Sequence, residues 1–329
     1  MTGELLQGYL PDPFIEFEVP ESWKIQKRQG KVRDILDKGD AQLALITTDR
    51  KSAFDRVLGS VPCTGEVNNR ISAFWFTVFN QGGGPRNHMI AVPDPNVMIV
   101  RKAMQRLPVE VVVRGYITGM TSTALWRIYS EGEREIYGHH FRDGYRNGDK
   151  LDEPVITPTT KADVGHDERL TCQEVVDRGL AAPDVWNQVQ TSALSMFKKA
   201  QDIALARGLV LMDTKMEFGL DGNGEPMVID ELFTGDSSRY VLASTYQQKV
   251  ESGQELDHMD KEFLRLNYRK ATGYRGDGEA PPIPDLLIAQ TADRYIRLHD
   301  MLTGTAFQMS RERPQERIEQ NLIPWIYPH

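Results

Sequence analysis

The segment that most constrains the fold runs from residue 209 to residue 219, where charged and apolar residues alternate with a period of two. In an extended strand, one face then carries the charged side chains of Asp213, Lys215 and Glu217. The other face carries Met212, Thr214, Met216 and Phe218. Asn223-Gly224 follows, which is the strongest short signal for a two-residue hairpin loop. The chain is therefore expected to contain an antiparallel sheet with one charged strand face.

The hairpin register predicts a cation site. With Asn223 and Gly224 as the loop, Glu217 lies opposite Asp230 on the returning strand. Like charges directly opposite each other destabilise a sheet, so a bound cation is expected between them. Mg²⁺ suits the pair because it takes one or two protein carboxylates and completes its shell with substrate phosphates and water. The alternative is an exposed strand face whose charges only solubilise it. Pro226 leaves the hairpin register open, because proline must fall where no backbone donor is needed.

The length and element pattern predict two domains. The chain has 329 residues, and domains usually hold about 150. Short β-like runs at 30–36, 41–47 and 97–100, with a helix at 68–80, indicate a small mixed β domain over residues 1–107. An apolar strand at 109–113 and helices at 184–207, 260–270 and 285–302 form a larger domain over 108–329. Because strands and helices do not alternate regularly, we expect an α+β fold with a mainly antiparallel sheet.

The overall charge shapes how this chain can bind anions. It has 39 Lys and Arg against 47 Asp and Glu, for a net charge of −8, which argues against nucleic acid as a partner. Any bound anion must then be met by cations placed locally. Three segments supply such cations, namely Gly30-Lys31-Val32-Arg33, the strand end at Arg114, and Asp236-Ser237-Ser238-Arg239.

Each of these segments has a functional and a structural interpretation. The glycine loop fits a turn folded over nucleotide phosphates, or a solvated basic hairpin. Arg114 ends an apolar strand, so it requires either a bound carboxylate or phosphate, or a buried ion pair. The third segment, residues 236–239, has the hydroxyl and guanidinium groups to bind a phosphate monoester, or it forms a turn capped by its own side chains. Together with the two acids, they indicate ATP chemistry on a second phosphorylated or carboxylated substrate.

The remaining composition favours a cytoplasmic chain with no membrane partner. The chain has two cysteines, its N-terminus lacks a basic segment followed by an apolar core, and no apolar run approaches 18 residues.

Four motifs occur in order along the chain, at residues 30–34, 112–119, 213–219 and 230–240. With further stretches at 52–55, 67–69, 157–161 and 166–167, they resemble the phosphoribosylaminoimidazole-succinocarboxamide synthase (SAICAR synthetase) family over about residues 30–303. The resemblance implies a SAICAR synthase-like fold with an ATP-grasp-like cleft between the two domains. It also implies ATP-dependent ligation of L-aspartate to the carboxylate of carboxyaminoimidazole ribonucleotide (CAIR), giving SAICAR, ADP and phosphate in purine biosynthesis. CAIR, L-aspartate and ATP would be the binding partners, and whether the chain forms a homo-oligomer stays an open question.

The resemblance also implies roles for individual residues. The loop over the ATP phosphates would comprise Gly30, Lys31 and Arg33, and the ligands of Mg²⁺–nucleotide would be Glu217 and Asp230. Asp213 and Lys215 would be the catalytic pair on the substrate side. The substrate-binding residues would be Arg114 and Arg239 for the ribonucleotide phosphate, Asp236, Ser237 and Ser238 beside them, and Lys161, His166 and Asp167 for aspartate or the ribonucleotide carboxylate.

One position departs from the family pattern, because Met120 stands where the family usually places a phosphate-binding serine. Thr121 or Ser122 would then take over, or the arginines would hold the phosphate alone. ATP would convert the carboxylate to an acyl phosphate for attack by the aspartate amine, so no protein nucleophile is needed. The alternatives are another ATP-dependent ligase, a small-molecule kinase, or a nucleotide-binding regulator without catalysis.

Overall fold

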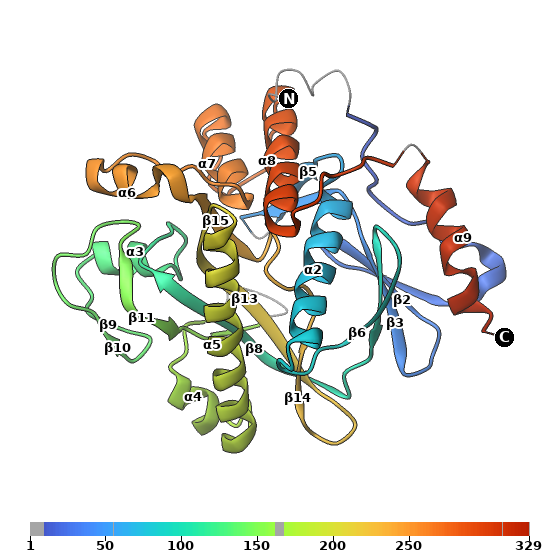
Figure 1. Cartoon of the computed structure of the whole chain (residues 1–329), viewed down its shortest axis with the longest axis horizontal. Helices are drawn as coiled ribbons and strands as arrows, with labels where there is room; N and C mark the ends of the chain where they lie inside the picture. Colours follow the sequence, from blue (N-terminus) through green and yellow to red (C-terminus); the bar gives the residue numbers. More distant parts are fainter. Residues whose placement is uncertain (1–9, 55, 162–167, 311, 329) are drawn as a thin grey trace.

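The computed structural model describes residues 10–54, 56–161, 168–310 and 312–328, and it contains two antiparallel sheets side by side. The first sheet, on the right of Figure 1, has the order β1-β2-β3-β7-β6. Its strands are β1 (Gln26–Gln29), β2 (Arg33–Asp37), β3 (Gln42–Thr47), β6 (Met89–Asp94) and β7 (Val97–Arg101). β2 starts at Arg33 because Gly30, Lys31 and Val32 form the turn after β1, so the strand predicted from residue 30 begins later.

The second sheet has the order β11-β8-β13-β14, with β12 also paired to β8 and β15 to β13. Its strands are β8 (Gln105–Tyr116), β11 (Lys150–Ile156), β12 (Thr159–Thr160), β13 (Leu209–Leu220), β14 (Pro226–Ile229) and β15 (Ser238–Leu242). Two short ribbons are formed by β4 (Arg50–Ala53) with β5 (Arg56–Ser60), and by β9 (Glu135–Ile136) with β10 (His139–His140). The predicted α+β class with a mainly antiparallel sheet is confirmed.

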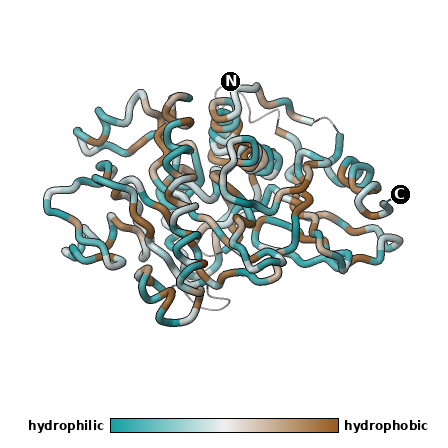
Figure 2. The backbone as a smooth tube through the Cα atoms, turned by 60° about the horizontal axis from the view of Figure 1, so that its bottom comes forward, coloured by the Kyte–Doolittle hydropathy of each residue, from teal (hydrophilic) through white to brown (hydrophobic). Residues whose placement is uncertain are grey.

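The helices cover these sheets and fill the space between them (Figure 1). They are η1 (Glu21–Trp23), α2 (Thr64–Gln81), α3 (Leu125–Ser130), α4 (Cys172–Asp177), α5 (Pro183–Ala206), α6 (Ala243–Ser252), α7 (Lys261–Thr272), α8 (Asp285–Thr303) and α9 (Pro314–Ile326). The main core joins Trp75 and Phe79 of α2 and Phe197 of α5 to Val111 of β8 and Met216 of β13. Hydrophilic colours mark most peripheral loops in Figure 2, and hydrophobic segments concentrate inside. No helix in the described ranges is both long and apolar enough to cross a membrane.

The predicted face of β13 is wrong at Met212. β15 pairs Tyr240 with Leu211 and Arg239 with Asp213, so Met212 is an extra residue in a β-bulge. The extra residue changes which face of the sheet the side chains before the bulge occupy, relative to those after it. Met212 therefore packs in a separate cluster with Val241, away from the main core that contains Met216.

The predicted hairpin register is also wrong, by one residue. Glu217 pairs with Ile229, and Leu220 pairs with Pro226, so the loop spans residues 221–225. The longer loop forms because the Asp221 carboxylate accepts the backbone N–H groups of Asn223 and Glu225, at 2.8 and 3.0 Å. Asp230 then lies just beyond β14 in the left-handed region, with φ of 67°.

The C-terminal helix α9 packs on the first sheet. Ile318 and Leu322 are fully buried in a cluster with Phe17, Leu36 and Ile99. The sheets are joined by residues 102–104, between β7 and β8. The division into domains at residues 107 and 108 stays a prediction.

Candidate active site

On the charged face of β13, two neighbouring carboxylates pair with lysine and arginine side chains. Glu217 lies opposite Glu110 of β8, and Lys215 reaches between them, with its Nζ 2.6 Å from Glu110 and 3.9 Å from Glu217. Arg106 lies 3.0 Å from the Glu217 carboxylate, and Lys161 also donates to it. The predicted juxtaposition of like charges therefore exists, but its second member is Glu110 rather than Asp230.

These carboxylates keep Lys215 charged. Desolvation would lower the pKa of Lys215, but Glu110, Glu217 and then Asp230 outweigh it and hold the pKa above its ordinary value. Lys215 thus acts as a fixed positive charge rather than a proton acceptor at neutral pH.

Arg33 connects the first sheet to the end of β14. Its guanidinium donates to the Asp230 carboxylate and lies 2.9 Å from Glu231. Burial would raise the pKa of Asp230, but Arg33 and Lys215 hold it below the usual value, so the group is an anion. The buried His88 ring fixes the same turn, because its Nε2–H donates to the Asp230 carbonyl at 3.1 Å.

The glycine loop is braced from one side. The Gly30 N–H donates to the Arg33 carbonyl at 2.7 Å, which closes the turn. Arg50 donates to the carbonyls of Gly30 and Lys31, at 3.0 and 3.1 Å, and to the buried Asp34 carboxylate at 2.8 Å. Lys31 itself is exposed. The loop is therefore held in shape while its lysine stays available to an anion.

Asp213 lies between the two predicted phosphate-binding arginines. Arg239 donates to its carboxylate, and Arg114 lies 3.4 Å away. Arg114 is buried and also donates to the Thr157 hydroxyl at 2.8 Å, while Arg239 lies 3.4 Å from Glu262. Arg114 thus has the buried ion pair that was one of its two predicted interpretations.

Asp236 and the two serines lie inside the fold. Asp236 accepts from Lys51 at 2.7 Å and from the Tyr295 hydroxyl at 2.6 Å. The Ser237 hydroxyl donates to or accepts from Thr234, and the Ser238 hydroxyl pairs with Thr214 at 2.8 Å. Ser237 thus has the partner of the capped-turn interpretation, whereas Ser238 pairs across the sheet with β13. His166 and Asp167 lie outside the described residues.

Sequence reasoning missed Glu110, Arg106 and Lys51. Glu110 and Arg106 had a local signal, since both lie at the less buried positions of β8 that alternate with Leu107, Val109 and Val111. Lys51 had none. Its pairing with Asp236 depends on tertiary contacts between distant segments.

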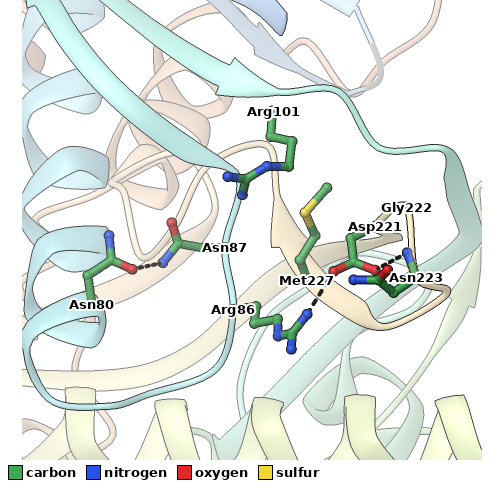
Figure 3. A pocket seen from close by; sticks show the side chains of 8 residues that line it. All are labelled: Asn80, Arg86, Asn87, Arg101, Asp221, Gly222, Asn223 and Met227. Carbon is green, nitrogen blue, oxygen red and sulfur yellow. Dashed lines mark hydrogen bonds and ion pairs between the residues drawn. The ribbon is translucent and has the colours of Figure 1, made fainter. Parts of the chain in front are cut away.

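A cavity of about 480 Å³ lies between the end of α2 and the β13–β14 turn (Figure 3). Figure 3 shows the Asn87 amide bonded to Asn80 and the Arg86 guanidinium bonded to Asp221, at 2.7 and 2.8 Å. Backbone bonds also join residues 86 and 88 to Val228 of β14. These contacts fix the segment that carries His88, and through it the Asp230 turn.

The donor set is compatible with a hard divalent cation. Glu217 and Asp230 offer carboxylate oxygens, and Glu217 pairs with Ile229, the residue before Asp230, so the two acids occupy neighbouring positions of the β13–β14 pair. Within the described ranges, no three His, Cys, Asp or Glu side chains form a complete ligand set. Mg²⁺ usually takes only one or two protein carboxylates and completes its shell with substrate phosphates and water.

Comparisons with known proteins agree on one family. The family model described as SAICAR synthetase matches residues 26–281. A phosphoribosylaminoimidazole-succinocarboxamide synthase of Legionella pneumophila (strain Lens) is 46% identical over 303 residues, covering 92% of this chain and 96% of its own. The chloroplastic enzyme of Arabidopsis thaliana is 41% identical over 295 residues, covering 89% of this chain and 71% of its own.

Solved structures agree as well. SAICAR synthase from Saccharomyces cerevisiae, complexed with SAICAR, has a TM-score of 0.76 at 28% identity. It matches 90% of this chain and 100% of its own. A SAICAR synthetase (Type-2) in complex with ADP has a TM-score of 0.67 at 22% identity, over 86% of this chain and 100% of its own, and supports the fold.

Proposed function

The chain belongs to the SAICAR synthetase family and is a ligase that joins L-aspartate to CAIR in purine biosynthesis, and we propose that the β13 face and the glycine loop form its ATP-driven active centre. One observation carries this proposal. Arg33, next to the loop, pairs with Asp230 and Glu231 at the edge of the charged β13 face. Nucleotide phosphates held by the loop would therefore lie beside the carboxylates and Lys215.

We assign the nucleotide end to the glycine loop and the acids. Lys31 is exposed on a turn that Arg50 holds in shape, so it can move onto a phosphate without unfolding the loop. Glu217 and Asp230 would hold Mg²⁺, which would offset phosphate charge when bound. In the structure Asp230 pairs with Arg33, and Glu217 pairs with Arg106 and Lys161, so these cations would have to give way to a bound metal.

The reaction follows from the weakness of a carboxylate as an electrophile. A CAIR carboxylate oxygen attacks the γ-phosphorus of ATP, the bond to the bridging oxygen breaks, and ADP leaves. The aspartate amine then attacks the acyl carbon, its proton is lost, and phosphate leaves as the amide forms. Lys215 stabilises negative charge near the transferring group, and Arg239 and Arg114 keep Asp213 oriented toward the substrate side.

The alternative functions differ in whether L-aspartate is required for product formation. A small-molecule kinase would give a stable phosphorylated product without it, and another ligase would need a different amine. A regulator would bind nucleotide without turnover. The internal bonds of Ser237 and Ser238 mean that those hydroxyls contribute to the shape of the Arg239 turn rather than to catalysis.

The deciding experiment is a coupled assay of ADP release with CAIR, ATP and Mg²⁺, with and without L-aspartate. We expect release that depends on aspartate and a product that contains both substrates. A stable phosphorylated ribonucleotide formed without aspartate would identify a kinase. No release under either condition would favour the regulator.

We place the enzyme in the cytoplasm. Both cysteines are free, and Cys63 is buried, which suits a reducing compartment. Fractionation of cells that express a tagged chain would test this location.

A further inference from the structure

The cavity of about 480 Å³ in Figure 3 lies at the junction of the two sheets and contains none of the predicted site residues. Its wall includes Arg101 at the end of β7, Met227 of β14, the turn at 221–223, and Asn80, Arg86 and Asn87 at and after the end of α2. A ligand in this cavity would therefore contact both sheets. Its volume lies within the range of about 300–1,000 Å³ that is usual for small-molecule sites.

Arg101 brings a cation without a counter-charge to this cavity. Its side chain is exposed, and in the part of the chain that the structure describes no carboxylate lies within ion-pair distance of it. The next residue, Lys102, differs in this respect, because its Nζ lies 2.7 Å from Asp37. The Arg101 backbone is fixed, since its N–H donates to the His88 carbonyl at 2.7 Å. The guanidinium therefore offers free donors at the end of a fixed strand.

Asp221 is the one acid among the described residues that line the cavity, and its charge is already used. Its carboxylate lies 2.8 Å from the Arg86 guanidinium and accepts the backbone N–H groups of Asn223 and Glu225. These backbone bonds, and then Arg86, hold the pKa of Asp221 below its usual value, so it stays an anion paired with Arg86. The positive charge of Arg101 is therefore left over.

The carboxamides of the cavity add further free donors. The Asn87 side chain is satisfied, because its oxygen accepts the Met89 N–H at 3.1 Å and its N–H donates to the Asn80 oxygen at 2.7 Å. Within residues 10–54, 56–161, 168–310 and 312–328, no acceptor is found for the Asn80 amide N–H groups or for those of the Asn223 side chain. Donors therefore outnumber acceptors, which favours a ligand rich in oxygen acceptors.

We propose that this cavity binds a small metabolite through a carboxylate or phosphate group, with Arg101 as its main ligand and the Asn80 and Asn223 amides bonded to its other oxygens. Both groups match the paired N–H donors of a guanidinium. On a chain with a net charge of −8, a small anion is held only where cations are placed locally, and Arg101 meets that condition. The site lies outside the centre proposed for CAIR, L-aspartate and ATP, so it adds a further ligand to the protein.

Isothermal titration calorimetry with sodium phosphate and with sodium malonate tests this site, and the two probes separate a phosphate from a carboxylate ligand. Arg101→Ala should weaken binding of the preferred probe by about tenfold or more, as expected for a lost charge-assisted bond, with an unchanged circular dichroism spectrum. Lys102→Ala is the matched control, since it removes the neighbouring cation, which does not line the cavity. It should bind both probes like the wild type.

Phosphate has another candidate site at the glycine loop, so Lys31→Ala is titrated in parallel. The binding that depends on Arg101 should persist in Lys31→Ala, because Lys31 does not line the cavity. This measurement needs neither CAIR nor turnover, so it can succeed or fail independently of the ADP-release assay. The proposal is overturned if neither probe shows binding that depends on Arg101, if Lys102→Ala causes an equal loss, or if all binding depends on Lys31.

Discussion

Replacing His88 tests how the fold holds the Asp230 turn. The ring is 3% exposed, its Nε2–H donates to the Asp230 carbonyl at 3.1 Å, and it packs 5.4 Å from the Phe76 ring. Burial lowers the pKa of His88 from 6.5 to about 4. The folded protein therefore keeps this imidazole neutral under conditions in which the unfolded chain protonates it.

The sign and size of the effect follow from linkage. Because the folded-state pKa is the lower one, stability is fully present above about pH 6.5 and is lost as the pH falls toward 4. At about 1.4 kcal/mol per pKa unit, the full loss is about 3 kcal/mol. Between pH 8 and pH 5, we expect His88 to account for a loss of about 2 kcal/mol.

Urea unfolding at pH 8, 6 and 5 measures this loss. His88→Gln keeps an N–H donor but does not titrate, so its free energy of unfolding should fall by about 2 kcal/mol less than that of the wild type over this range. Equal pH slopes for His88→Gln and the wild type would refute the reasoning.

Three further predictions concern the site and its supports. Glu217→Gln and Asp230→Asn should each lower kcat by about a hundredfold or more in the ADP-release assay, with an unchanged circular dichroism spectrum. Leu322→Ala, in the fully buried face of α9, should lower the free energy of unfolding by about 2–5 kcal/mol in urea. Lys51→Met should cost about 3–5 kcal/mol, because it leaves Asp236 buried without its partner, and Asp236→Asn in the same chain should recover part of it.

Each of these predictions has a contradicting result. Wild-type turnover and Mg²⁺ dependence in both carboxylate variants would remove these acids from the metal site. A Leu322→Ala chain as stable as the wild type would mean that α9 adds little to the first sheet. No recovery in the Lys51→Met, Asp236→Asn chain would show that the cost of Lys51→Met arises from lost packing over the Tyr295 ring, 3.9 Å away, rather than from the unpaired charge.

Local signals in the sequence predicted local structure well. Thr171 and Glu174 have the Thr-x-x-Glu spacing typical of a capping box and form one, since each side chain accepts the other residue's backbone N–H. The helix predicted over 184–207 is α5, and Gly208 follows it with φ of 78°. These features depend on residues within a turn or two of each other. The charged face of β13 was predicted for the same reason.

Pairing between distant strands was harder to predict. The Asn223-Gly224 signal competes with Asp221, whose side chain captures two backbone N–H groups and lengthens the loop. A shift of one residue changed the partner of Glu217 from Asp230 to Ile229. Glu110 became its like-charged neighbour through β8, which no pattern near β13 reveals. The positions of His88 and Lys51 depend on tertiary packing in the same way.

The distribution of counter-charges separates structural cations from those that can bind ligands. Lys51 is buried 2.7 Å from Asp236, and Arg317 is buried 2.9 Å from Asp94. If either cation turned toward a ligand, it would leave a buried carboxylate without its partner. Lys31 is exposed, and no such partner is found for it among the described residues. A ligand anion can engage Lys31 without breaking an existing ion pair. In an acidic chain, an exposed cation of this kind is therefore a better candidate for binding a ligand anion than a lysine or arginine that already neutralises a buried carboxylate.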